Sequence, residues 1–264
     1  MHSENILFGN TPFNKDVIDD VWKLRPDSFE EMAEYQSWFD NCDSLDETIK
    51  RGIIDFHTKI MGADVYRLIG NPCEKVALEI GYGGGRLLSA ASTIFKSVVG
   101  IDILNEKSVN MTKKFLEITN RKNFKLFDEK ETEKIEDESV DFVYSFIVFQ
   151  HFSSIEYFHK YMSLIKRVLK PGGTANIFFG MPSFNLREEI VNHISEAGFF
   201  HWHGEFNPDE HRSTLFYSHE WVVEQVNSVY NFETKVCARP LKQPWSSPDQ
   251  VSSQFCVIFN KPRI

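Results

Sequence analysis

The fold is decided by one stretch of sequence, Val76-Ala77-Leu78-Glu79-Ile80-Gly81-Tyr82-Gly83-Gly84-Gly85, which continues into Arg86-Leu87-Leu88-Ser89-Ala90-Ala91. The first five residues predict a buried strand, the glycines a tight turn, and the last residues the start of a helix. Glycines suit such a turn because they let the chain bend sharply and let a ligand approach backbone N–H groups at a helix N-terminus. The stretch therefore predicts a ligand-binding turn in an α/β sheet.

The spacing of these glycines distinguishes between kinds of ligand. A dinucleotide fingerprint would place its last glycine where Arg86 stands, so G-x-G-x-x-G fails at that position while G-x-G-x-G is present. Glu79, just before the turn, suits a ligand with an ammonium group better than one with a pyrophosphate. A nicotinamide-dependent oxidoreductase is therefore the weaker alternative.

Short apolar segments alternate with helical ones on both sides of the turn, which is typical of βαβ units and a parallel sheet. We expect strands at 75–80, 97–102, 124–127, 140–146 and 174–179, with helices near 85–95, 105–118 and 154–169. A helix near 219–229 then leads to an antiparallel pair, 232–238 and 255–260. The predicted fold is α/β and Rossmann-like, a doubly wound, mostly parallel seven-stranded sheet.

Two regions depart from this repeating unit. Residues 1–74 are expected to form an irregular arm and helices that pack on the core at 75–264. Residues 181–217 indicate an insertion after the fifth strand, which we expect to cover the acceptor side of the cleft. Three capping boxes, beginning at Ser28, Ser44 and Ser153, predict helix starts. After the second, residues 45, 49, 53, 56 and 60 are apolar and define one helical face.

Composition and charge exclude several classes of protein. The net charge is −9, which disfavours nucleic acid as a partner, since phosphate neutralisation needs a basic face. No apolar stretch is long enough to span a membrane and no secretory leader is recognisable, so a cytoplasmic protein without a membrane partner is expected. The four cysteines form no C-x-x-C pair, which favours reduced thiols over a zinc site or a disulfide framework.

A second candidate ligand group ends the next predicted strand, Val98-Val99-Gly100-Ile101-Asp102. Asp102 follows the glycine turn by about 20 residues, the interval at which a strand-end carboxylate accepts hydrogen bonds from a ribose. The alternative is a helix N-cap or a solvated strand end.

With these elements in place, the chain resembles the class I, Rossmann-like methyltransferases that use S-adenosylmethionine, in their small-molecule branch. The likeness rests on motifs in family order over about residues 75–180. They are the glycine turn 78–86, Gly100-Ile101-Asp102, Ser139-Val140-Asp141-Phe142-Val143-Tyr144-Ser145, Phe149-Gln150-His151 and Leu169-Lys170-Pro171-Gly172-Gly173.

The resemblance implies S-adenosyl-L-methionine as cofactor and a role for each matching residue. Gly81, Gly83 and Gly85 would approach its amino acid part, with Tyr82 in place of the more frequent small residue, and Glu79 would bind its ammonium. Asp102 would hold the ribose and Ile103 would pack beside the adenine. Asp128 matches the position that meets the adenine amino group, and Phe146 the position beside the methionine part.

Methyl transfer from a sulfonium is an in-line displacement, so the protein mainly positions the acceptor and removes its proton where necessary. His151 is the candidate catalytic base, because it follows the fourth strand and histidine titrates near neutrality. A histidine that only braces the following loop is the alternative. The expected function is methylation of an oxygen or nitrogen of a small-molecule acceptor. A non-catalytic cofactor-binding partner subunit is the alternative from another class.

Five histidines between residues 193 and 219 form a further candidate group. Their simplest interpretation is a polar lining of the acceptor pocket. A metal site is a weaker alternative because no known ligand spacing is matched, and no metal is expected. The histidines are His193, His201, His203, His211 and His219. The aromatic candidates for the acceptor pocket are Trp38, Phe39, Trp202, Phe206, Phe216, Tyr217 and Trp221.

Overall fold

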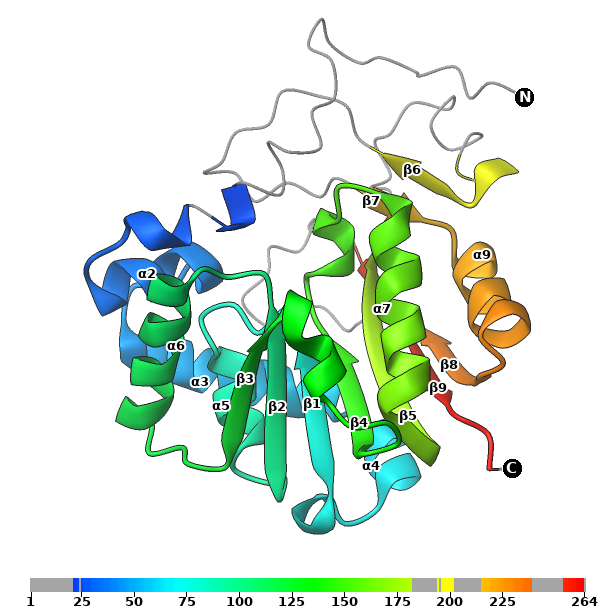
Figure 1. Ribbon diagram of the computed structural model, residues 1–264, viewed down its shortest axis with the longest axis horizontal. Helices are drawn as coiled ribbons and strands as arrows, with labels where there is room; N and C mark the ends of the chain where they lie inside the picture. Colours follow the sequence, from blue (N-terminus) through cyan, green and yellow to red (C-terminus); the bar gives the residue numbers. More distant parts are fainter. Residues whose placement is uncertain are drawn as a thin grey trace, which may run out of the picture.

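A seven-stranded sheet in the order β3-β2-β1-β4-β5-β9-β8 forms the centre of the molecule (Figure 1). The computed structural model describes residues 21–23, 25–181, 194, 196–201, 215–238 and 254–263. Strands β1 to β5 are parallel, whereas β9 runs antiparallel to both β5 and β8. The strands are β1 Val76–Ile80, β2 Ser97–Asp102, β3 Phe124–Asp128, β4 Val140–Ser145, β5 Leu169–Gly180, β8 Glu233–Ala238 and β9 Gln254–Asn260. The predicted fold class and the closing antiparallel pair are confirmed.

Helices cover both faces of this sheet, and short helical turns connect them. In Figure 1, α7 lies in front of the sheet and α3 behind it. The α-helices are α2 Met32–Asp40, α3 Leu45–Asp55, α4 Ala63–Ile69, α5 Arg86–Ala91, α6 Glu106–Ile118, α7 Ile155–Val168 and α9 His219–Glu224. The turns are η1 Pro26–Ser28, η2 Phe56–Ile60, η3 Pro72–Glu74, η4 Glu129–Lys134, η5 Phe149–His151 and η6 Gln225–Val229.

Alternating residues of the central strands divide the core into two clusters. Leu78 and Val143 face α7 and η6, whereas Ala77 and Tyr144 face η2, α4 and α5. This division follows from the two-residue period of a strand, because successive side chains point to opposite faces. The near-continuous apolar runs of β1, β2 and β4 are those of strands buried on both faces.

Two predicted boundaries are wrong, for local reasons. Helix α5 ends at Ala91, short of the predicted residue 95, because the Ser92 and Thr93 hydroxyls bond to helix carbonyls and compete with the backbone. Strand β5 begins at Leu169, whereas the predicted strand begins at residue 174. Gly172 N–H donates to the Lys261 carbonyl at 2.7 Å, and Lys261 N–H donates to Gly173, so pairing beyond β9 extends the strand.

Only one of the three predicted capping boxes caps a helix. The Ser44 hydroxyl accepts a hydrogen bond from Glu47 N–H at 3.2 Å and starts α3, although the Glu47 carboxylate accepts from Asp43 N–H instead of the cap. Ser28 lies in η1, and its hydroxyl donates to the Arg25 carbonyl. At α7 the N-cap is Ser154, which makes no side-chain capping bond, so the box beginning at Ser153 is wrong.

Helix α3 buries polar positions in addition to the predicted apolar face, of which Leu45 and Ile49 pack half-buried against the core and Phe56 and Ile60 are buried in η2. The buried residues of α3 are Thr48, Gly52 and Asp55, while Ile53 is exposed. A Cβ on Gly52 would lie 2.6 Å from the Arg86 carbonyl oxygen, so α3 packs unusually close to α5 through a small residue. Apolar spacing alone could not reveal that polar residues form the contact.

Part of the insertion 181–217 belongs to the described residues. Strands β6 Phe199–His201 and β7 Leu215–Tyr217 form a small antiparallel sheet. The Tyr217 hydroxyl donates to the Phe149 carbonyl at 3.1 Å, which attaches this sheet to η5. Residues 1–20, most of the predicted helix near 186–197 and residues 202–214 lie outside the described part.

Candidate active site

A cavity opens at the carboxyl ends of β1, β2 and β4, where loops of a doubly wound sheet form ligand sites. One half is lined by the glycine turn and by acidic groups, among them Glu79, Asp40 and Asp102. The other half is lined by His151 and by aromatic rings, namely Trp22, Phe152, Tyr157 and Tyr161. The two halves therefore differ in chemistry, one anionic and one aromatic.

The structure brings most of the predicted cofactor residues together around this cavity. Those that line it are Glu79, Gly81, Tyr82, Gly83, Asp102, Ile103 and Phe146, together with the predicted base His151. Gly85 and Asp128 are not among the lining residues. Asp128 caps η4, where its carboxylate accepts a hydrogen bond from Lys130 N–H at 2.8 Å. The individual roles of all these residues stay predictions.

The glycine turn has the backbone that only glycine adopts easily. Gly81, Gly83 and Gly85 have φ values of +75°, +47° and +87°. A Cβ on Gly83 would lie 2.9 Å from the Phe39 ring, and one on Gly81 would lie 2.3 Å from the Val148 side chain. Helix α2 therefore sits directly on the turn, and the Gln36 amide donates to the Gly84 carbonyl at 2.7 Å.

Asp102 is held in place by backbone N–H groups at the end of β2. One carboxylate oxygen accepts from Gly83 N–H and the other from Ile103 N–H, both at 2.7 Å. Burial raises the pKa of Asp102 to about 6, although these two hydrogen bonds oppose the shift. A carboxylate has about four acceptor positions, so Asp102 keeps capacity for further donors.

Glu79 ends β1 inside the molecule, with 2% of its surface exposed. The Tyr144 hydroxyl donates to its Oε2 at 2.9 Å. Burial raises the pKa of Glu79 to about 8, while the Tyr144 hydrogen bond and the charge of Arg86 act in the opposite direction. An ammonium ligand would favour the ionised form of this carboxyl.

His151 lies in η5 with little exposed surface, and its ring packs against Trp22 with centroids 4.6 Å apart. Its Nε2 is 3.2 Å from the Gln150 amide nitrogen. An amide nitrogen can only donate, so Nε2 accepts in this contact and a neutral ring carries its proton on Nδ1. The side chain is thus oriented as a hydrogen-bond acceptor beside the aromatic half of the cavity.

Several lining residues were not predicted from the sequence. Trp22 and Asp40 come from the N-terminal segment, whereas Tyr157 and Tyr161 come from α7. The aromatic pair on α7 has a sequence signal, because positions four apart share one helical face. Of the aromatic candidates proposed for the acceptor pocket, Phe39 lines this cavity and Trp38, Phe216, Tyr217 and Trp221 do not, while Trp202 and Phe206 lie outside the described residues.

A comparison with known protein families identifies the domain that contains this cavity. Residues 78–177, from β1 into β5, match the family described as a methyltransferase domain. The chain contains a class I, S-adenosylmethionine-dependent methyltransferase domain. This result favours the predicted enzyme over a nicotinamide-dependent oxidoreductase. No curated protein matches the sequence.

Solved structures with low sequence identity share the fold of this methyltransferase. An S-adenosylmethionine-dependent methyltransferase from Methanosarcina mazei is 19% identical, with a TM-score of 0.57 over 76% of this chain and 98% of that one. Magnesium protoporphyrin IX methyltransferase from Synechocystis is 12% identical, with a TM-score of 0.59 over 94% and 99% of the two chains. Burkholderia thailandensis 1,6-didemethyltoxoflavin-N1-methyltransferase is 13% identical, with a TM-score of 0.58 over 99% and 98%.

The groups around the anionic half of the cavity fit the cofactor of this methyltransferase family. Glu79 offers an acceptor for an ammonium, Asp102 keeps acceptor capacity for ribose hydroxyls, and Ile103 and Leu104 offer apolar contact for a purine. Phe146 also lines the cavity, with Lys59 Nζ 4.5 Å from its ring centroid. These acceptor and apolar side chains are therefore chemically complementary to S-adenosylmethionine.

Two further features concern what this methyltransferase carries besides its cofactor. No helix in the described part of the chain is long and apolar enough to cross a membrane. Within the same residues, no group of three or more histidine, cysteine or acidic side chains is placed to hold a metal ion. Of the histidines considered for such a site, His201 and His219 are described, whereas His193, His203 and His211 are not. The four cysteines, all within the described residues, are not paired with one another in the structure.

Proposed function

We propose that this methyltransferase transfers a methyl group from S-adenosylmethionine to an oxygen or nitrogen of a small-molecule acceptor bound in the aromatic half of the cavity. One observation carries the proposal: a single cavity joins the glycine turn and its carboxylates to a group of aromatic side chains around His151. The Phe152 and Tyr161 rings are stacked at 5.4 Å, with Tyr157 5.7 Å from Phe152. Such a wall suits a flat or apolar acceptor and excludes water.

The residues of the chain would act mainly by positioning. The bound cofactor supplies the activated methyl group. The anionic half holds the donor, the aromatic rings orient the acceptor in line with it, and His151 accepts the acceptor's proton. For this step the acceptor's O–H or N–H takes the place of the Gln150 amide at Nε2.

Three further points support a small molecule as acceptor. The net charge of −9 is unfavourable for nucleic acid. Of the lining rings, Phe152 and Tyr161 are buried and Trp22 and Tyr157 are half-buried, so the aromatic half suits a compact acceptor better than a protein surface. Magnesium protoporphyrin IX and 1,6-didemethyltoxoflavin, which the names of two structural neighbours contain, are small molecules.

The test follows the methyl group itself. Purified protein is incubated with S-adenosylmethionine labelled with tritium in its methyl group and with a cell extract divided by ultrafiltration. We expect label in the low-molecular-weight fraction, and fragmentation mass spectra of the labelled product that place the added methyl on oxygen or nitrogen. Label that enters only the protein or nucleic acid fraction, or a methyl group on carbon, contradicts the proposal.

A variant of the predicted base gives a second test. His151→Asn, whose amide can form hydrogen bonds but cannot take a proton, should lower the rate of methyl transfer about a hundredfold.

A further inference from the structure

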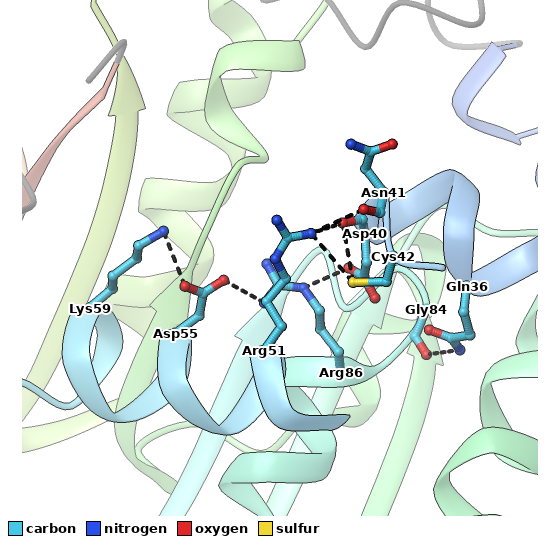
Figure 2. Close-up of polar contacts among 9 residues, drawn as sticks. All are labelled: Gln36, Asp40, Asn41, Cys42, Arg51, Asp55, Lys59, Gly84 and Arg86. Carbon is cyan, nitrogen blue, oxygen red and sulfur yellow. Dashed lines mark hydrogen bonds and ion pairs between the residues drawn. The ribbon is translucent and has the colours of Figure 1, made fainter. Parts of the chain in front are cut away.

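A buried ion cluster joins the N-terminal helices to the helix that follows the glycine turn. Arg86, the first residue of α5, donates from Nε to Asp40 Oδ1 at 2.6 Å and from Nη1 to Asp55 Oδ2 at 2.7 Å. Figure 2 shows Arg86 between the two carboxylates, which come from α2 and α3. The three side chains are 12%, 6% and 5% exposed. Because buried charges require partners, this cluster fixes both helices on the turn.

The cluster keeps its arginine charged. Burial lowers the pKa of Arg86, but the two carboxylates outweigh it, so the pKa lies above the usual value. Burial likewise raises the pKa of Asp40 to about 6, and the charge of Arg86 opposes this shift. Asp40 is therefore mostly ionised at neutral pH.

The two carboxylate partners of Arg86 differ in how many of their oxygens are paired. Both oxygens of Asp55 are engaged, since its Oδ1 is 3.2 Å from Lys59 Nζ (Figure 2). Asp40 uses only Oδ1, and within the described part of the chain its buried Oδ2 has no hydrogen-bond partner. The Arg51 guanidinium donates to the backbone carbonyls of Asp40 and Asn41. A buried carboxylate oxygen without a donor is costly, so its position calls for a ligand.

Asp40 also lines the cavity, together with Glu79 and Gly81. The negative charge of Asp40 contributes to the raised pKa of Glu79, so the two carboxyl groups act on each other across the cavity. A cation with several N–H donors between them would relieve this repulsion and satisfy the unpaired oxygen. Asp55 does not line the cavity and cannot take this role.

We propose that Asp40 is a second carboxylate for the α-ammonium of the cofactor, carried by α2 and oriented by Arg86. The inference rests on the cofactor site proposed above and adds the N-terminal helix to it. The α-ammonium has three N–H groups, so Glu79 and Asp40 can each accept one of them. Arg86 is then a positioning residue, which holds Asp40 Oδ1 and leaves Oδ2 for the ligand.

The experiment compares Asp40→Asn with Asp55→Asn by calorimetry. Each variant neutralises one of the two carboxylates that pair with Arg86, and thermal unfolding checks that both variants fold. The probes are S-adenosylhomocysteine, its desamino analogue without the α-amino group, and methylthioadenosine, which lacks the whole amino acid part. We expect Asp40→Asn to weaken S-adenosylhomocysteine about tenfold and to leave the other two probes within about twofold. Asp55→Asn should change all three by less than about threefold.

The possible outcomes separate this inference from the cofactor site itself. Equal losses for S-adenosylhomocysteine and the desamino analogue, or no loss for either, would overturn the role of Asp40 while the cofactor site stands. Failure of the wild type to bind any of the three probes would overturn both. A crystal structure of the wild type with S-adenosylhomocysteine tests the contact without a variant. An Asp40 oxygen within about 3.2 Å of the α-nitrogen supports the inference, and a separation beyond hydrogen-bond reach rejects it.

Discussion

Glu79 is a carboxyl group whose charge is controlled by its neighbours at the end of β1. Burial raises its pKa to about 8, the Tyr144 hydroxyl and the charge of Arg86 oppose this, and Asp102 and Asp40 add to it. At pH 7 the free protein therefore holds a proton there. The predicted contact with the ammonium of the cofactor would favour the ionised form, and the proton would then leave on binding.

This coupling predicts how cofactor affinity depends on pH. From pH 6.5 to 8 the affinity for S-adenosylhomocysteine should rise, by at most about tenfold per pH unit, because ionisation of Glu79 costs less as the pH approaches its pKa. Calorimetry across this range measures the slope. In Glu79→Gln the affinity should be lower and independent of pH in the same range. A wild type with a flat profile would show that Glu79 does not ionise on binding.

The hydrogen bond from Tyr144 to Glu79 offers a second test of the pKa of this carboxyl group. Tyr144→Phe removes the hydrogen bond to Glu79 Oε2 and keeps the buried ring. Because that hydrogen bond lowers the pKa of Glu79, its loss should shift the rise in affinity to higher pH and weaken binding a few-fold at pH 7. A uniform loss at every pH would indicate a packing defect.

Residues that act through the local chain were predictable, and residues that act through distant partners were not. Glu79, Gly83 and Asp102 were found because each has a fixed place relative to the strand and turn of its own motif. Arg86 belongs to the same motif, but its partners Asp40 and Asp55 lie far upstream, and no spacing relates them. A charged residue opening the apolar helix 86–91 was the only signal of a buried ion pair.

The capping boxes make a prediction at the scale of one element. Ser44→Ala should reduce the free energy of unfolding by about 1 kcal/mol, because the hydroxyl satisfies Glu47 N–H at the start of α3. Ser154→Ala is the matched control, since the Ser154 hydroxyl is buried without a hydrogen bond. Its removal should be neutral or slightly stabilising. Chemical denaturation measures both variants, and equal losses would show that the Ser44 hydrogen bond does not account for the effect.

The close contact between α3 and α5 allows a second stability prediction. Gly52→Ala would raise intrinsic helix propensity, yet the new Cβ would lie 2.6 Å from the Arg86 carbonyl. We expect a net loss of about 1–3 kcal/mol in unfolding free energy, because a backbone atom cannot move aside as a side chain can. Lys50→Ala on the exposed face of α3 should leave the unfolding free energy nearly unchanged, because its ion pair with Asp46 is exposed to solvent. A Gly52→Ala variant more stable than the wild type would mean that the two helices can separate easily.

At the scale of the whole molecule, sequence patterns were sufficient for the strands of the sheet and insufficient for its N-terminal layer. The parallel part of the sheet followed from βαβ alternation, which is set by local periodicity and short connections, whereas the strand order came from the structure. The position of α2 over the glycine turn depends on Gln36, Phe39 and Asp40 meeting residues of another segment. The proposed boundary at residue 74 stays a prediction, because α2 and α3 share their contacts with the core.

A hydrogen bond attaches the described part of the insertion to η5, beside the aromatic half of the cavity, and this contact can be tested. Tyr217, in β7, donates to the carbonyl of Phe149, which begins the turn that carries His151. Tyr217→Phe keeps the buried ring but leaves that carbonyl without its donor, so η5 should hold His151 less firmly. We expect methyl transfer to the acceptor found by labelling to fall about tenfold, equivalent to about 1.4 kcal/mol, with affinity for S-adenosylhomocysteine within about twofold. Tyr230→Phe is the control, because its hydroxyl bonds His159, which does not line the cavity, and neither quantity should change. If Tyr217→Phe weakens S-adenosylhomocysteine as much as it slows methyl transfer, the insertion supports the whole core and has no particular role at the acceptor.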